Sequence, residues 1–166
     1  MPQIPTIKFI EKGTIHLIGM SIFGNFHKEP TIPKLWQEFG PYISKIPNRV
    51  NIEQCFGLEV YTDSFMKSKQ WHYMTAVEVN SLENIPVFAS ARTLPPNRYA
   101  VFTHKGLVSN ISQTFDYIYS TWLPNSGYEI AAPYDFEFYD ERFKGGQSED
   151  SETDIYLPVR LKEKKQ

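Results

Sequence analysis

Two glutamates, each with a tyrosine two positions later, are the residues of this sequence best suited to chemistry. Glu137 and Tyr139 lie in one stretch rich in strand-forming residues, and Glu59 and Tyr61 lie in another. Because successive side chains of a strand alternate between its faces, each Glu and its Tyr should share a face. A carboxylate beside aromatic rings suits a hydrophobic organic cation, since the rings contact the ligand and the carboxylate neutralises it.

The same residues permit two other interpretations. A carboxylate whose pKa is raised by apolar surroundings can act as a general base on water, with a nearby tyrosine hydroxyl as hydrogen-bond donor. A glutamate in a strand can also simply face water, while the tyrosines pack and expose their hydroxyls. The residue pattern is compatible with ligand binding, with hydrolysis and with a solvated surface.

The two stretches belong to an internal repeat. Leu58-Glu59-Val60-Tyr61 aligns with Phe136-Glu137-Phe138-Tyr139, and Ile46-Pro47-Asn48 aligns with Leu123-Pro124-Asn125. The two motifs occur in the same order in both halves, and each is separated from its copy by nearly the same number of residues. The chain is therefore predicted to contain one unit twice, and a groove between the two copies is the natural place for a ligand.

The predicted fold class is α+β, with each half formed by a strand, a helix and a hairpin. We interpret residues 1–166 as a single domain with pseudo-repeats at about 6–80 and 86–160. Apolar residues at helical spacing predict helices over 33–46 and 108–122. Two such halves pairing edge to edge would form one antiparallel sheet with both helices on one face and a ligand groove between the halves.

This arrangement leaves the opposite face of the sheet uncovered. We expect that face to carry the predicted site residues, which are Glu59, Tyr61, Glu137, Tyr139 and Tyr156. An aromatic and acidic face of this kind is unusual for a surface that only contacts water. It is therefore the predicted ligand-binding surface.

Charge and composition argue against several classes of partner. The formal net charge is −2 and the pI is about 6.1, which provides no basic field for nucleic acid or an anionic membrane. No stretch approaches the roughly 20 apolar residues that span a bilayer. The single cysteine, Cys55, and four scattered histidines show no metal-ligand spacing. We expect a cytoplasmic protein that uses no cofactor or metal and binds neither nucleic acid nor membrane directly.

Several motifs between Tyr99 and Val159 together resemble a known family. They are Tyr99-Ala100-Val101-Phe102 with His104-Lys105-Gly106, Trp122-Leu123-Pro124 with Ser126-Gly127-Tyr128, Asp135-Phe136-Glu137-Phe138-Tyr139, and Asp154-Ile155-Tyr156-Leu157-Pro158-Val159. In combination they resemble the GyrI-like small-molecule-binding domain. That family includes the effector-binding domains of AraC-type and multidrug-sensing bacterial transcription activators.

The resemblance implies a duplicated fold with a groove between its halves, aromatic walls, and a buried glutamate that contacts cationic or amphipathic ligands. Carried onto this sequence, that glutamate is Glu137. Some GyrI-like proteins hydrolyse cyclopropane-containing toxins with Glu and Tyr, which would here be Glu137 and Tyr139. Family members that regulate transcription carry a separate DNA-binding domain, whereas this chain reaches its first predicted strand within about ten residues.

We therefore expect a stand-alone protein that binds hydrophobic or cationic small molecules and could act through a regulatory protein partner. A small hydrolase of cyclopropane-containing toxins is the alternative. A third interpretation is a protein that inhibits a gyrase-like enzyme by binding to it.

Overall fold

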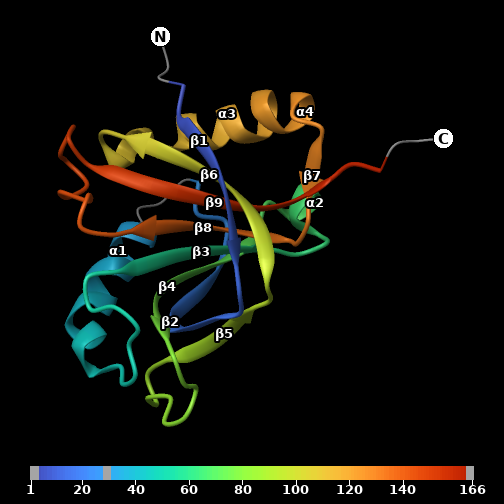
Figure 1. The fold of residues 1–166 in the computed structure, drawn as a ribbon. Coiled ribbons are helices and arrows are strands. Elements are labelled where there is room, and N and C mark those ends of the chain that lie inside the picture. The colour runs from blue at the N-terminus through green and yellow to red at the C-terminus, as the bar shows by residue number, and fades with distance from the viewer. Residues whose placement is uncertain (1–3, 28–30, 164–166) are drawn as a thin grey trace.

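The computed structural model describes residues 4–27 and 31–163. Within these residues the chain forms one large antiparallel sheet with helical segments packed against it (Figure 1), which confirms the predicted α+β class. The strands are β1 (Thr6–Lys12), β2 (Ile15–Gly24), β3 (Cys55–Tyr61), β4 (Trp71–Val79), β5 (Ser90–Leu94), β6 (Asn97–Lys105), β7 (Tyr128–Ile130), β8 (Tyr134–Tyr139) and β9 (Glu152–Leu161). The helical segments are α1 (Thr31–Phe39), η1 (Gly40–Lys45), α2 (Phe65–Ser68), η2 (Val108–Asn110), α3 (Ile111–Tyr117), η3 (Ile118–Trp122) and α4 (Leu123–Asn125).

The order of the strands is symmetric about the middle of the sheet. It runs β1-β6-β9-β8-β3-β4-β2-β5, with β7 paired beside β9. Strands β1, β2, β3 and β4 of the first half correspond to β5, β6, β8 and β9 of the second half. If each strand is replaced by its counterpart, the result is the same order read backwards. The two central strands, β3 and β8, pair with Leu58 opposite Phe136. We interpret the symmetry as two copies of one unit, each with its first strand placed in the other half of the sheet.

The sheet is strongly curled, because two short turns join strands from opposite ends of the order. Only Gly13 and Thr14 separate β1 from β2, and only Pro95 and Pro96 separate β5 from β6. Each joined pair is six positions apart in the order, which would be about 29 Å in a flat sheet. The three peptide units of each turn reach at most about 11 Å. The chain can make both turns only if the sheet folds back on itself.

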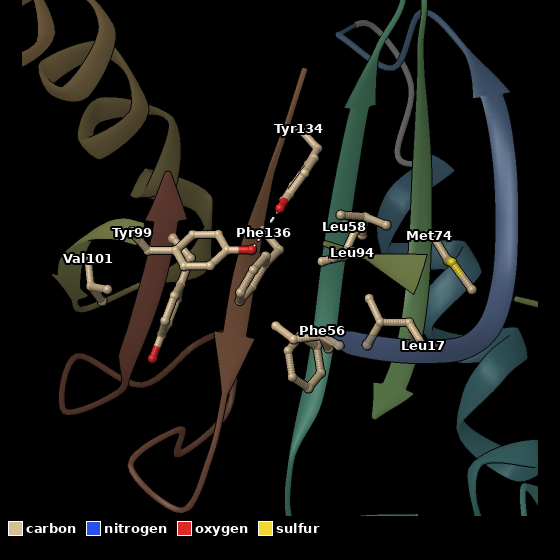
Figure 2. Packing of buried hydrophobic residues seen from close by; sticks show 12 residues of the cluster. Leu17, Phe56, Leu58, Met74, Leu94, Tyr99, Val101, Tyr134 and Phe136 are labelled. Atoms are coloured by element: carbon tan, nitrogen blue, oxygen red, sulfur yellow. Dashed lines mark hydrogen bonds between the residues drawn. The ribbon is translucent and has the colours of Figure 1, made fainter. Parts of the chain in front are cut away.

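The inner face of the curled sheet is filled by a hydrophobic core. Its residues come from strands of both halves and include Leu17, Phe56, Leu58, Met74 and Phe136 (Figure 2). All of these side chains are essentially inaccessible to water. The expectation of an uncovered face opposite the helices was therefore wrong, because the curl covers that face with the sheet's own side chains.

Tyr156 lies in this core and not with the other predicted site residues. Strand β9 pairs with β8 so that Tyr156 is opposite Phe136, and their rings stack with centroids 4.6 Å apart. Residues opposite each other in neighbouring strands point to the same face. Tyr156 therefore points to the inner face, whereas Glu137, one residue after Phe136, points to the outer one.

Both helical regions lie on the outer face, as predicted. Helix α1 packs against β2 and β4, and α3 packs against β6. The helix predicted over 33–46 is divided, because α1 ends at Phe39 and the chain continues from Gly40 as the 3-10 turn η1. The helices lie over the two sides of the sheet and pack less closely on the central strands β3 and β8. No helix in the described part of the chain is long and apolar enough to cross a membrane.

Gly19 is required by the close approach of β2 to β4. It pairs with Ala76, and a Cβ at Gly19 would overlap backbone atoms of Thr75 and Ala76. Backbone of a paired strand cannot move aside without losing ladder hydrogen bonds. We predict that Gly19→Ala lowers the free energy of unfolding by about 2 kcal/mol or more, measured by urea denaturation.

Gly13→Ala is the matched control for this prediction. Nothing lies within 4 Å of the Cβ position at Gly13, so the change in unfolding free energy should stay within about 0.5 kcal/mol. Equal losses in the two variants would show that contact with β4 does not constrain Gly19.

Candidate functional site

A cavity of about 1640 Å³ opens on the outer face, between α1 and the α3 region. It is larger than the roughly 300–1,000 Å³ of most small-molecule sites. Strands β3 and β8 contribute Glu59, Tyr61, Glu137 and Tyr139 to its lining. Much of the remaining lining is aromatic and includes Trp36, Phe65, Trp71, Phe115 and Phe143.

Glu137 forms the first acidic centre of the cavity. It is 7% exposed, and its Oε2 accepts hydrogen bonds from the hydroxyls of Tyr73, at 3.1 Å, and Tyr139, at 2.6 Å. The Trp36 Nε1 donates to the Tyr73 hydroxyl oxygen at 2.9 Å, so a chain of donors runs from α1 to the carboxylate. Burial raises the pKa of Glu137, and the hydrogen bonds from Tyr139 and Tyr73 partly oppose this rise.

Gly57 provides the space for this centre. It lies opposite Glu137 in the β3–β8 pair, and a Cβ there would overlap both the Tyr73 hydroxyl and Glu137 Oε2. A glycine inside a strand often marks a close approach of this kind. Any side chain at position 57 would displace the hydrogen-bonded pair.

A second acidic centre adjoins the first and contains a carboxyl group that the sequence analysis did not select. Asp135 lies directly opposite Glu59 in the β3–β8 pair. The Tyr61 hydroxyl is 2.9 Å from Glu59 Oε2 and 3.1 Å from Asp135 Oδ2. Tyr119 also donates to Asp135 Oδ2. Because a hydroxyl has one hydrogen, Tyr61 can donate to only one of the two carboxyl groups at a time.

Neither a lysine nor an arginine balances these carboxyl groups among the described residues that line the cavity, where His27 is the one basic side chain. Burial raises the pKa of Asp135 to about 7. Burial also raises the pKa of Glu59 well above its usual range, and the neighbouring Asp135 and Glu137 raise it further. Among the described residues, no group of three or more His, Cys, Asp or Glu is placed to hold a metal ion. The carboxyl groups of the cavity therefore retain protons more readily than they would in water.

The structure brings four of the five predicted site residues to this cavity, namely Glu59, Tyr61, Glu137 and Tyr139. Tyr156 lies on the opposite face of the sheet. Sequence analysis missed Asp135, Tyr73 and Tyr119. Strand alternation could have identified Asp135, which is two residues before Glu137. The two tyrosines depend on the position of β4 and on the rotation of η3, which local sequence patterns do not determine.

Similar sequences are found among known proteins. The sequence model of the Cass2 family, described as integron-associated effector binding protein, matches residues 8–159. The transcriptional regulator BrlR of Pseudomonas aeruginosa is 32% identical over 152 residues, which are 92% of this chain and 54% of the regulator. The chain thus spans about half the length of this relative.

Solved structures share the fold. SAV2435 bound to tetraphenylphosphonium has a TM-score of 0.74 and 19% identity, over 93% of this chain and 94% of that chain. A hydrolase from Listeria innocua has a TM-score of 0.56 and 12% identity, over 96% of this chain and 94% of that chain. At these levels of identity the similarity establishes the fold.

The raised pKa of Asp135 predicts that the protein is more stable in mild acid than in mild base. Between the ordinary aspartate pKa of about 4 and the folded-state value of about 7, the folded protein binds more protons than the unfolded chain. The free energy of unfolding should therefore fall as pH rises through this range. We expect a loss of a few kcal/mol between about pH 5 and about pH 8, measured by urea denaturation.

Asp135→Asn isolates this contribution. The amide does not titrate, so the pH dependence of the variant should be markedly flatter than that of the wild type. A variant with the same pH dependence as the wild type would show that Asp135 is ionised normally in the folded protein.

Proposed function

Since this chain belongs to the Cass2 family of integron-associated effector-binding proteins, we propose that its cavity binds lipophilic organic cations. Family membership confirms the resemblance to effector-binding domains that the sequence motifs indicated. It supports the binding of a small molecule and does not specify which kind. The proposal adds the chemical class of the ligand.

The observation that carries the proposal is the unbalanced charge of the cavity. Glu59 and Glu137 line it, Asp135 lies beside them, and the described lining supplies neither lysine nor arginine. A buried carboxylate without a cationic partner is costly. A ligand cation would remove this cost, whereas a neutral or anionic ligand would not.

The aromatic lining is suited to the apolar part of such a ligand. The Trp36 and Tyr139 rings meet edge to face with centroids 5.4 Å apart, and Tyr61 and Phe65 are 4.8 Å apart. Aromatic faces attract cations and contribute large contact areas. Tetraphenylphosphonium, which occupies the structurally similar SAV2435, combines one positive charge with four phenyl rings and is the natural probe.

We predict that the protein binds tetraphenylphosphonium and discriminates strongly against tetraphenylborate, an anion of the same shape. Glu137→Gln should weaken tetraphenylphosphonium binding tenfold or more, because a charge-assisted contact contributes roughly 1.5–3 kcal/mol. Isothermal titration calorimetry would measure both effects.

Glu53→Gln is the control for general electrostatics. Glu53 also borders the cavity but is exposed to water, so its neutralisation should change affinity by less than about threefold. Equal affinity for the two ions, or wild-type affinity in Glu137→Gln, would refute charge recognition at Glu137.

Hydrolysis is the second candidate, favoured by the 2.6 Å hydrogen bond from Tyr139 to Glu137. A buried carboxylate of raised pKa could act as general base on water, with the tyrosine as donor. If so, Glu137→Gln should slow ring opening of a cyclopropane-containing electrophile by roughly 10²–10⁴-fold, measured by mass spectrometry. Turnover that is absent in the wild type, or unchanged in the variant, would eliminate this candidate.

A further inference from the structure

We propose that the cavity contains two cation subsites, one at Glu137 and one at Glu59, and that it selects compact dications over monocations. The inference rests on the proposed function, because it assumes that the cavity takes cations. It adds the number and the spacing of the positive charges in the preferred ligand.

Each half of the molecule builds one subsite from the same two residue types. Tyr139 donates to Glu137 at 2.6 Å, and Tyr61 donates to Glu59 at 2.9 Å. In both halves the tyrosine follows its glutamate by two positions in a central strand. Both glutamates line the same cavity, and Glu59 remains partly accessible through it. The symmetry of the fold therefore presents two similar carboxylates to one ligand.

The strand register places the two glutamates close together on one face of the sheet. Glu59 lies opposite Asp135, and Glu137 lies opposite Gly57, so the glutamates are diagonal neighbours across the β3–β8 pair. The backbone positions of such neighbours are about 7–8 Å apart. This separation is too short for two bulky aromatic cations bound side by side. It suits one molecule that carries two positive charges on a short linker.

Asp135 gives independent evidence for a missing partner at the Glu59 subsite. It is fully buried, and its Oδ1 has no hydrogen-bond partner among the residues that the structure describes. Its other oxygen competes with Glu59 for the single hydrogen of the Tyr61 hydroxyl. The carboxylate oxygens of this centre thus outnumber the tyrosine hydroxyls that can donate hydrogen bonds to them. A monocation at Glu137 leaves this imbalance in place, whereas a second positive charge near Glu59 reduces it.

The second centre can supply negative charge near neutral pH. The pKa of Asp135 is raised only to about 7, so a nearby cation would ionise it at modest cost. The hydroxyls of Tyr119 and Tyr61 favour the charged form. The cavity, at about 1640 Å³, is large enough for a ligand with two charged ends and aromatic substituents.

The test compares a bis(benzyldimethylammonium)alkane with its isosteric monocation, in which one quaternary nitrogen is replaced by carbon. The linker is chosen to place the two nitrogens about 7–8 Å apart. Affinities are measured by isothermal titration calorimetry for the wild type, Glu59→Gln, Asp135→Asn and the rim control Glu53→Gln. Thermal melts confirm that each variant is folded.

We expect the wild type to bind the dication at least tenfold more tightly than the monocation. Glu59→Gln should abolish most of this preference because it weakens binding of the dication much more than binding of the monocation, and Asp135→Asn should reduce the preference in the same way. Glu53→Gln should retain it. If Glu59→Gln does not fold, the Asp135→Asn result decides.

The second subsite would be overturned if the wild type bound both compounds equally. It would also be overturned if the dication preference survived both Glu59→Gln and Asp135→Asn. Either result would leave the proposed function standing. Failure of the wild type to bind tetraphenylphosphonium and both ammonium compounds would overturn the proposed function, and this inference with it.

Discussion

The site depends on the burial of three carboxyl groups in a cavity whose described lining supplies no lysine or arginine. Asp135, Glu59 and Glu137 point to one face of the two central strands, and the described cavity lining contains no lysine or arginine. Their pKa values rise chiefly because the groups have lost water. Tyrosine hydroxyls compensate only in part. Such an arrangement costs stability, and its persistence is typical of a site adapted to bind a charged partner.

The rest of the fold makes this costly arrangement possible. Short turns at Gly13 and at Pro95-Pro96 force the sheet to curl, so the main hydrophobic core fills the inner face and stabilises the molecule there. The helices then pack on the two sides of the outer face, which leaves β3 and β8 free to line a cavity. Because Gly57 has no side chain, it leaves room beside Glu137 for the carboxylate and its tyrosine donor. The stabilising core and the destabilising acidic site are thereby separated by the thickness of one sheet.

Local sequence patterns predicted much of the fold and part of the site. Alternation placed Glu137 and Tyr139 on one face of their strand, and the repeated motif identified Glu59 and Tyr61 as their counterparts, because both signals are periodic. Tyr156 was misplaced because its face depends on the register between β8 and β9. The face opposite the helices was expected to be uncovered because local sequence patterns do not show the curl of the sheet. The curl arises from two turns that join strands distant from each other in the sheet. Tyr73 and Tyr119 reach the carboxylates only through tertiary packing.

The most direct test of charge imbalance as the basis of binding is to count protons when a ligand enters. Wild-type protein would be titrated with tetraphenylphosphonium in buffers of different ionisation enthalpy, at about pH 6 and about pH 8. A cation that ionises buried carboxyl groups must displace the protons that they hold, so we predict proton release at the lower pH and tighter binding at the higher pH. Binding with the same affinity at both pH values and no proton release would contradict this, because it would mean that the carboxyl groups of the empty cavity are already fully ionised or do not meet the ligand.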